Sequence, residues 1–140
     1  MTDDGTVAMD TLPLSLDPLR EASTGAARLP SGTDLGHVHL EVSSLSGARS
    51  FYVDGLGLDV RQSMPSALFP AFGDYHHHVG CNVWNGRTEP ATGRGLAWVE
   101  LGVDDPEAIR ARLDPATVAE HEGGLEARDP DGLTIRLERA

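Results

Sequence analysis

The chain contains no lysine, since all 11 of its basic residues are arginine. This absence excludes chemistry that proceeds through a lysine Schiff base. The single cysteine, Cys81, cannot form a disulfide within the chain, as is typical of a reducing cytoplasm. No apolar run approaches the roughly 18 residues of a membrane span, and the acidic N-terminus lacks the pattern of a signal peptide. We therefore expect a cytoplasmic protein.

Positive charge is scarce as well. The 22 acidic residues of the chain outnumber its 11 basic ones, and the formal net charge of the 140 residues is -11. Such a surface repels phosphate backbones and anionic lipids. We therefore expect a small-molecule ligand, and neither nucleic acid nor a membrane, as the partner.

The first 35 residues differ in composition from the remainder, because they are rich in acidic residues, Gly, Ser and Thr. We interpret residues 1–35 as a tail or linker. Within it, LDPLREA (16–22) predicts a short helix with Asp17 as its cap and Pro18 in its first turn. Residues 36–140 are long enough for one domain with its own core.

Within residues 36–140, one pattern occurs twice at an offset of 61 residues. Each unit begins with an alternating strand, continues with a capped helix and ends with three short strand candidates. A serine caps the first helix, and DDPEAIRARL (104–113) predicts the second, with Asp104 as its cap. The matched residues are Val38 with Val99, Leu40 with Leu101, Val42 with Val103, and Arg49 with Arg110. The sequence therefore predicts an α+β fold of two βαβββ modules, residues 36–84 and 95–140. Their curved mixed sheets are expected to surround a common cleft.

Three consecutive histidines lie in DYHHHVGCN (74–82), which is part of the strand candidate 75–84. Side chains alternate between the two faces of a strand. We therefore expect His76 and His78 to face the cleft together with Asn82, and His77 to face away. A bulge near Gly80 would exchange the roles of His77 and His78.

The fragments GHVHLEV…FYVDGLGL and DPDGLTIRL resemble the opening strand and helix and the closing hairpin of the vicinal oxygen chelate superfamily. This superfamily includes glyoxalase I, bleomycin-resistance proteins and extradiol dioxygenases. TLPLSLDPLREA, ALFPAFGDYHHHVGCNVW and GLAW further resemble the C-terminal half of bacillary-type two-domain catechol 2,3-dioxygenases. Nothing in the chain resembles their N-terminal half, where those enzymes are expected to hold the complete iron site.

The resemblance implies four metal-ligand positions, which fall here on His37, His78, Trp98 and Arg136. Neither an indole nor a guanidinium ligates a metal at neutral pH, so the usual two-histidine, one-carboxylate triad lacks its carboxylate. Replacement carboxylates lie one strand step from these positions, at Glu41, Glu100 and Glu138. Glu100 is the preferred one, because the pseudo-twofold repeat places it beside His39. We therefore expect iron, manganese or zinc on His37, His78 and Glu100.

A metalloenzyme that acts on a small substrate with vicinal oxygens, either catechol-like or enediol-like, is the first hypothesis. In it, His39 or His76 moves a proton and Arg136 holds an anionic group of the substrate. The remaining cleft residues are Glu41, Asn82, Trp84, Trp98 and Glu138. An ion network between Arg136 and the carboxylates is an equally good interpretation of Glu41 and Glu100.

Two alternatives remain open. The first is a metal-free protein that binds a drug or metabolite, as in the bleomycin-resistance relatives, with Trp84 and Trp98 stacking on a flat ligand. The second is a half that pairs with a separate subunit. Because open sheet edges favour association, we also expect a homodimer.

Overall fold

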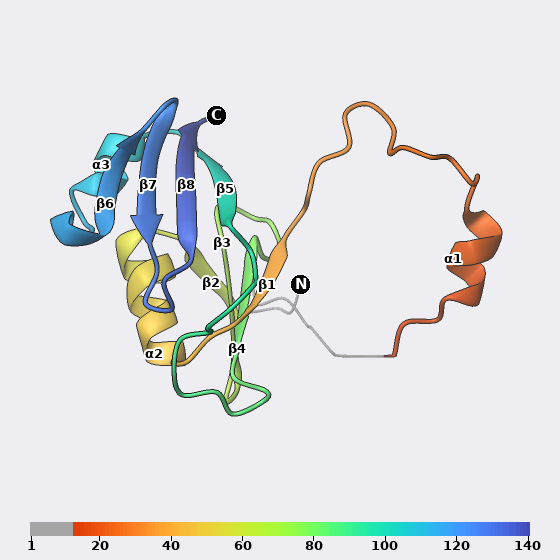
Figure 1. Cartoon of the computed structure of the whole chain (residues 1–140), viewed down its shortest axis with the longest axis horizontal. Helices are drawn as coiled ribbons and strands as arrows, with labels where there is room; N and C mark the ends of the chain where they lie inside the picture. Colours follow the sequence, from red (N-terminus) through yellow and green to blue (C-terminus); the bar gives the residue numbers. More distant parts are fainter. Residues whose placement is uncertain (1–12) are drawn as a thin grey trace.

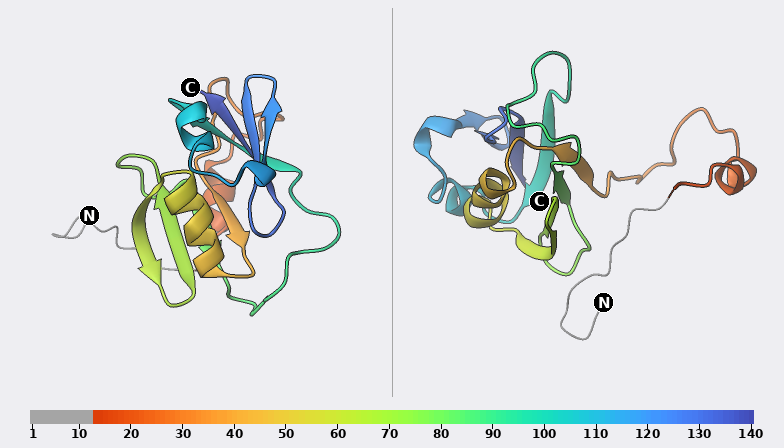
Figure 2. Two further views of the ribbon diagram at one scale, coloured as in Figure 1. Left: turned by 90° about the vertical axis from the view of Figure 1, so that its left-hand side faces the viewer. Right: turned by 90° about the horizontal axis from the view of Figure 1, so that it is seen from below.

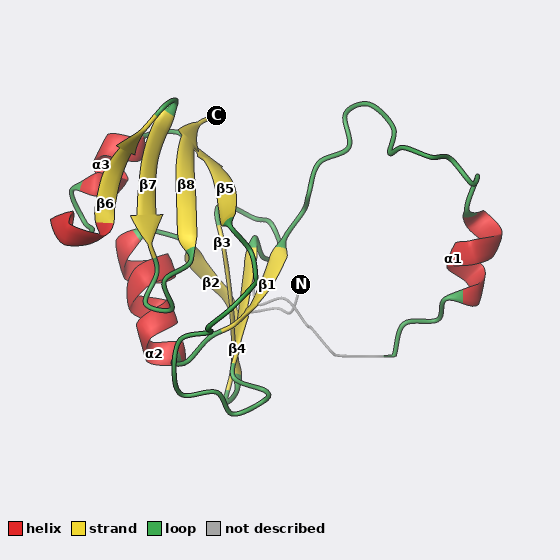
Figure 3. Cartoon of the chain, viewed as in Figure 1, coloured by secondary structure: helices red, strands yellow, loops and turns green. Residues whose placement is uncertain are grey.

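In the computed structural model, which describes residues 13–140, the chain forms two four-stranded sheets of the same topology (Figure 1). One sheet has the order β1-β4-β3-β2 and the other the order β5-β8-β7-β6 (Figure 3). The strands are β1 (Val38–Glu41), β2 (Asp59–Met64), β3 (Ala67–Ala71), β4 (Val79–Asn82), β5 (Trp98–Val103), β6 (Val118–His121), β7 (Gly124–Arg128) and β8 (Thr134–Arg139). In each sheet the first strand pairs parallel with the last, and the other pairs are antiparallel. The predicted α+β fold and its internal repeat are confirmed.

One helix follows the first strand of each module. The first is α2 (Leu45–Ala48), which continues into the wider π-helical segment η1 (Arg49–Gly55) and crosses the first sheet (Figure 2, left). Ser44 caps it as expected, accepting a hydrogen bond from the amide of Gly47.

The second helix, α3 (Pro106–Arg110), is shorter than the predicted 104–113. Its cap is Asp105 and not Asp104, because the Asp105 carboxylate accepts from the amide of Ala108. The turn η2 (Pro115–Thr117) then leads into β6.

Alternation along the first strand of each module separates a core face from an open face. In β5, Val99, Leu101 and Val103 are buried, whereas Trp98, Glu100 and Gly102 are exposed. Buried side chains from both sheets and from the helices form one continuous cluster. The two modules therefore share a core, and the faces turned away from the helices are free to carry polar side chains.

The N-terminal segment lies apart from the two modules (Figure 1). Its helix α1 (Asp17–Ala22) buries none of its residues. Asp17 does not cap it: the helix begins at Asp17 itself, and this carboxylate pairs with Arg20. Among residues 13–140, no helix is both long and apolar enough to cross a bilayer.

Asp129, in the closing turn of the second module, ties the two modules together. Its Oδ2 atom accepts a hydrogen bond from the Tyr52 hydroxyl at 2.9 Å, and its Oδ1 atom accepts from the amides of Asp131 and Leu133. Asp129 is buried, and burial raises the pKa of its carboxyl group although the three donors act in the opposite direction. Ionised Asp129 is therefore a cost to the folded state.

We predict that Asp129→Asn becomes more stable relative to the natural chain as the pH rises. The amide can keep all three hydrogen bonds, since Oδ1 still accepts and Nδ2 can donate to the Tyr52 oxygen. The stability that protonated Asp129 contributes is present below the unfolded pKa of about 3.9 and is lost as the pH rises through the folded pKa. Urea unfolding of both proteins between pH 3 and pH 7 measures the difference. A difference that stays constant or changes in the opposite direction contradicts this account.

Candidate functional site

Three histidine side chains meet on the open face of the first sheet. His37 directly precedes β1 and His39 lies within it, so the two residues share one face of the strand. His77 reaches the same place from the segment before β4. One ring nitrogen of each lies within 4.8 Å of the others, the one such group of potential metal ligands in residues 13–140.

The position of His77 corrects the expectation that it faces away. Strand β4 begins only at Val79, and residues 72–78 form a turn with Gly73 at φ 57°. The alternation rule therefore does not apply to the three histidines. His77 is only 6% exposed and lies on the cleft side, whereas His78 points toward Phe72 and its Nδ1 atom accepts from the Phe72 amide.

Contacts within the group are close. The Nε2 atoms of His39 and His77 lie 3.0 Å apart, so one donates to the other. The rings of His37 and His77 have centroids 4.3 Å apart. The Nδ1 atom of His77 is buried, and no group in residues 13–140 bonds to it. A buried nitrogen without a partner indicates a site built for a group from outside the chain.

Gly80 makes room for the His39 ring. His39 and Gly80 are partners in the parallel pairing of β1 with β4. A Cβ atom at Gly80 would lie only 2.9–3.1 Å from three atoms of the His39 imidazole. Only glycine leaves this ring its position over β4 and next to His77.

The environment keeps two of the three imidazoles neutral. Burial, followed by repulsion from His37, His76, His39 and His78, lowers the pKa of His77 to about 4. Burial and repulsion from His37 also lower the pKa of His39. At pH 7 their nitrogen lone pairs are therefore available to a metal without loss of a proton.

The residues present fit a divalent metal ion. Three neutral imidazoles are a recognised donor set for zinc, with a fourth position left for water or substrate. Two such nitrogens at 2.0–2.1 Å from a tetrahedral ion lie about 3.3 Å apart, close to the separation of the two Nε2 atoms. Iron and manganese also accept imidazole ligands, so the donor set does not select the metal.

Two further histidines lie beside the group. The His76 ring is half-buried, with its centroid 5.2 Å from that of His37 and 4.6 Å from that of His77. His78 was predicted as a ligand but is not among the three grouped histidines. It lines, together with His37, a pocket of about 450 Å³ between β1 and β5.

The predicted carboxylate ligand, Glu100, lines the same pocket as His37 and His78 but is not in the group of three histidines. It is exposed on the open face of the second sheet. Arg136 is its neighbour in the pairing of β5 with β8. The Arg136 guanidinium lies 4.2 Å from the centre of the Trp98 ring, and its Nε donates to Glu126 at 2.8 Å. Arg136 therefore belongs to an ion pair, but its partner is Glu126 and not the predicted Glu41 or Glu100.

The other predicted cleft residues are dispersed. Glu138 lies 3.7 Å from His121 on the second sheet. Asn82 is buried; its side chain donates to the carbonyl of Leu40 and accepts from the amide of Trp84, so its role is structural. Trp84 is half-exposed and lines neither of the two pockets flanking β1.

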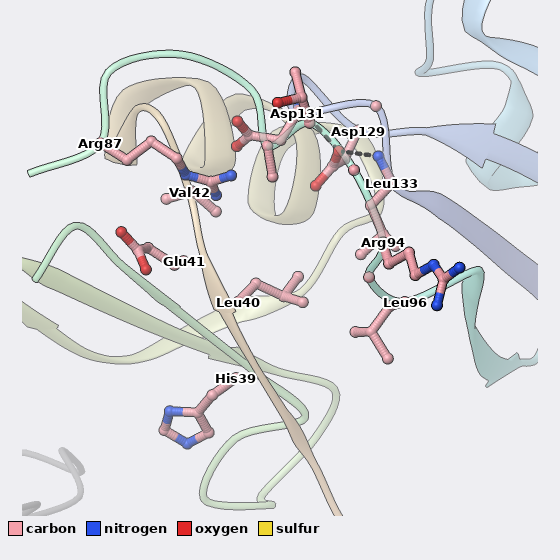
Figure 4. Close-up of a pocket in the computed structure, with 15 residues that line it drawn as sticks. His39, Leu40, Glu41, Val42, Arg87, Arg94, Leu96, Asp129, Asp131 and Leu133 are labelled. Carbon is pink, nitrogen blue, oxygen red and sulfur yellow. Dashed lines mark hydrogen bonds between the residues drawn. The ribbon is translucent and has the colours of Figure 1, made fainter. Parts of the chain in front are cut away.

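Glu41 lines the second of these pockets, which has a volume of about 510 Å³ and includes His39 (Figure 4). Two lining residues, Arg87 and Arg94, come from the loop between the modules. The sequence analysis assigned no role to either arginine. The only signal for them was their position in an acidic chain, within a Gly- and Pro-rich segment.

Comparisons with known proteins agree with this geometry. No protein-family profile matches the chain. The chain is 32% identical over 139 residues to the catechol-2,3-dioxygenase of Bacillus subtilis (strain 168), and the match covers 91% of this chain and 49% of that protein. The chain thus spans about half the length of this curated relative.

Solved structures show the same fold. A trypanothione-dependent glyoxalase I of Leishmania major is 23% identical, with a TM-score of 0.58 over 76% of this chain and 86% of that one. TnmS3, an antibiotic binding protein from Streptomyces sp. CB03234, is 22% identical, with a TM-score of 0.54 over 79% of this chain and 98% of that one. One architecture thus occurs both in an enzyme and in a binding protein.

We predict that His77→Ala loses bound metal, whereas His78→Ala retains it. The first change removes one of the three grouped imidazoles, and the second removes a ring outside the group whose nitrogen already accepts from a backbone amide. Metal analysis of tag-free proteins, with circular dichroism to verify folding, measures the outcome. Loss in His78→Ala with retention in His77→Ala would show that the ligand assignment is wrong.

We also predict that Gly80→Ala weakens metal binding although every ligand remains. The added methyl group displaces the His39 ring, and a misplaced ligand lowers metal affinity by about 10- to 100-fold. Competition with a chromophoric chelator measures this change. Gly86→Ala is the control for a glycine substitution, since nothing lies within 4 Å of a Cβ there, although its φ of 68° makes it costly to stability. An unchanged affinity in Gly80→Ala would contradict the role given to the His39 position.

Proposed function

Since the chain belongs to the vicinal oxygen chelate superfamily, we propose that it is a metalloenzyme acting on a small substrate with two adjacent oxygens, such as a catechol or an enediol. The observation that carries this proposal is the group of His37, His39 and His77. A structural cluster would have every buried nitrogen bonded, whereas Nδ1 of His77 has no partner in residues 13–140. The sequence similarity to a catechol-2,3-dioxygenase favours a catechol among these substrates.

The three histidines would hold the metal, which when bound acts as a Lewis acid on the two substrate oxygens. His76 is the residue placed to accept a proton from a substrate hydroxyl, because its ring lies beside His37 and His77 and is half-buried. An imidazole exchanges protons readily near neutral pH. His39, which was predicted to move a proton, is proposed here as a metal ligand instead.

Two pockets adjoin the histidine group, and the one between β1 and β5 is suited to an uncharged substrate ring. His37 lies at its wall, so a ring in this pocket has its oxygens near the histidine group. Phe72, Leu96 and Trp98 give it apolar and aromatic walls. These walls would orient the ring and exclude water from part of its surface.

A metal-free binding function is the second candidate. The same apolar pocket, together with the fold shared with an antibiotic binding protein, supports it. The two candidates differ in one measurable property, because only the metalloenzyme requires an ion on the histidine group.

We predict that the protein purified without a polyhistidine tag contains about one equivalent of iron, manganese or zinc. With iron bound, it should consume dioxygen when catechol is added, and His37→Ala should abolish both the metal and the dioxygen consumption. Elemental analysis and an oxygen electrode measure these two properties. Absence of metal after growth in metal-replete medium would contradict the metalloenzyme and favour the binding protein.

A further inference from the structure

The pocket of about 510 Å³ beside His39 has a different character from the apolar pocket beside His37. It lies between β1, the closing turn near Asp131 and the loop that joins the modules (Figure 4). Three carboxylates and two guanidinium groups line it. These charged side chains differ in whether they have hydrogen-bond or ion-pair partners within the chain.

The three carboxylates are already bonded. Glu41 accepts from the Asn85 side chain at 2.8 Å. Both oxygens of Asp131 accept from the Ser43 amide, at 2.9 and 3.2 Å. Asp129 accepts the three hydrogen bonds described above. These donors are neutral, so they occupy acceptor positions on the carboxylates without cancelling their charge.

Arg87, unlike the carboxylates, has a nitrogen atom without a hydrogen-bond partner. Its Nε atom is buried without an acceptor, and no ion pair joins Arg87 or Arg94 to another group within residues 13–140. In Figure 4 the Arg87 guanidinium points into the pocket over Val42, whereas that of Arg94 points away from its centre. The half-buried guanidinium thus has no charged partner in the described chain, and the planar geometry of its terminal amino groups matches a carboxylate.

The histidine group reinforces this demand. A metal held by three neutral imidazoles would keep its double positive charge within its ligand set, because none of the grouped ligands is a carboxylate. His39 belongs both to this group and to the lining of the pocket. A ligand spanning the two places would meet positive charge at both ends.

We infer that the substrate carries a carboxylate in addition to its two adjacent oxygens, that Arg87 binds this carboxylate, and that the ring of such a substrate lies in the pocket beside His39 and not in the one beside His37. This inference rests on the proposed function, since it takes the histidine group as the site of the adjacent oxygens. It makes Arg87 a specificity-determining residue of the loop between the modules. Arg136 does not serve in this way, because Glu126 and the Trp98 ring already occupy it.

The test compares two probes, catechol and 3,4-dihydroxybenzoate, which differ by one carboxylate. Both are titrated calorimetrically into the full chain loaded with zinc, which binds imidazole but does not turn the probes over. We expect dihydroxybenzoate to bind about 10-fold more tightly or better, as a charged hydrogen-bonded pair provides. Arg87→Gln should abolish this preference and leave catechol binding unchanged. Arg87→Lys, which keeps the charge but loses the planar fork, should fall between the two.

Two further variants separate a direct contact from a general charge effect. Arg20→Gln removes one positive charge on α1, far from the pocket, and should keep the full preference (Figure 1). Arg94→Gln removes a guanidinium from the same loop and should have a smaller effect than Arg87→Gln. Equal losses in Arg87→Gln and Arg94→Gln would overturn the assignment to Arg87.

The proposed function and this inference fail in different ways. Zinc and catechol bound without a preference for dihydroxybenzoate would overturn the inference alone. A chain that binds no zinc, or that binds zinc but neither probe, would contradict the proposed function as well. Circular dichroism of each variant shows whether the loss of binding arises from a loss of fold.

Discussion

The parallel register of β1 against β4 determines the geometry of the site. It places His39 directly opposite Gly80, the one residue type whose lack of a side chain lets an imidazole lie across the neighbouring strand. With the ring in this position, its Nε2 atom meets that of His77, which enters from the turn before β4. A shift of the register by one residue would set His39 against Val79 or Cys81, whose side chains point into the core. The site therefore depends on the pairing of two short strands.

The sequence was sufficient to predict the fold, because its signals are local and occur twice. Alternation in β5 matches the buried and exposed residues one for one, and the 61-residue repeat corresponds to two sheets of identical strand order. The signals for the helix caps also depend mainly on neighbouring residues. Asp105 is the cap and not the predicted Asp104, because the helix begins at Pro106 and the Asp105 carboxylate accepts from the amide of Ala108.

The site was only partly predictable. His37 and His39 were recognised as sharing a face, since both lie on a regular strand. His77 was placed on the wrong face because the alternation rule was extended past the end of β4, into residues that the pairing with β1 and β3 does not hold in a strand. The Gly73-Asp74 pair in front of the histidines was a turn signal that favoured a later strand start. Arg87 could not have been identified from a local pattern, since its orientation depends on a loop packed against a turn more than 40 residues away in the sequence.

The two modules show how one scaffold can carry different chemistry on its two open faces. In the second sheet, Trp98 and Glu100 take the positions of His37 and His39, and Arg136 takes the position of Gly80. Where the first module leaves a vacant space for an imidazole, the second fills it with a guanidinium that lies over Trp98 and bonds to Glu126. These replacements are mutually consistent, because an aromatic ring and a carboxylate both stabilise an arginine between them.

The second face is thus closed to a metal by its own ion network, and the unmet bonding capacity of the described chain is concentrated around β1. There, neutral imidazoles and an arginine without an acceptor flank the same strand. Both kinds of group accommodate negative charge on a ligand, although the chain as a whole is acidic.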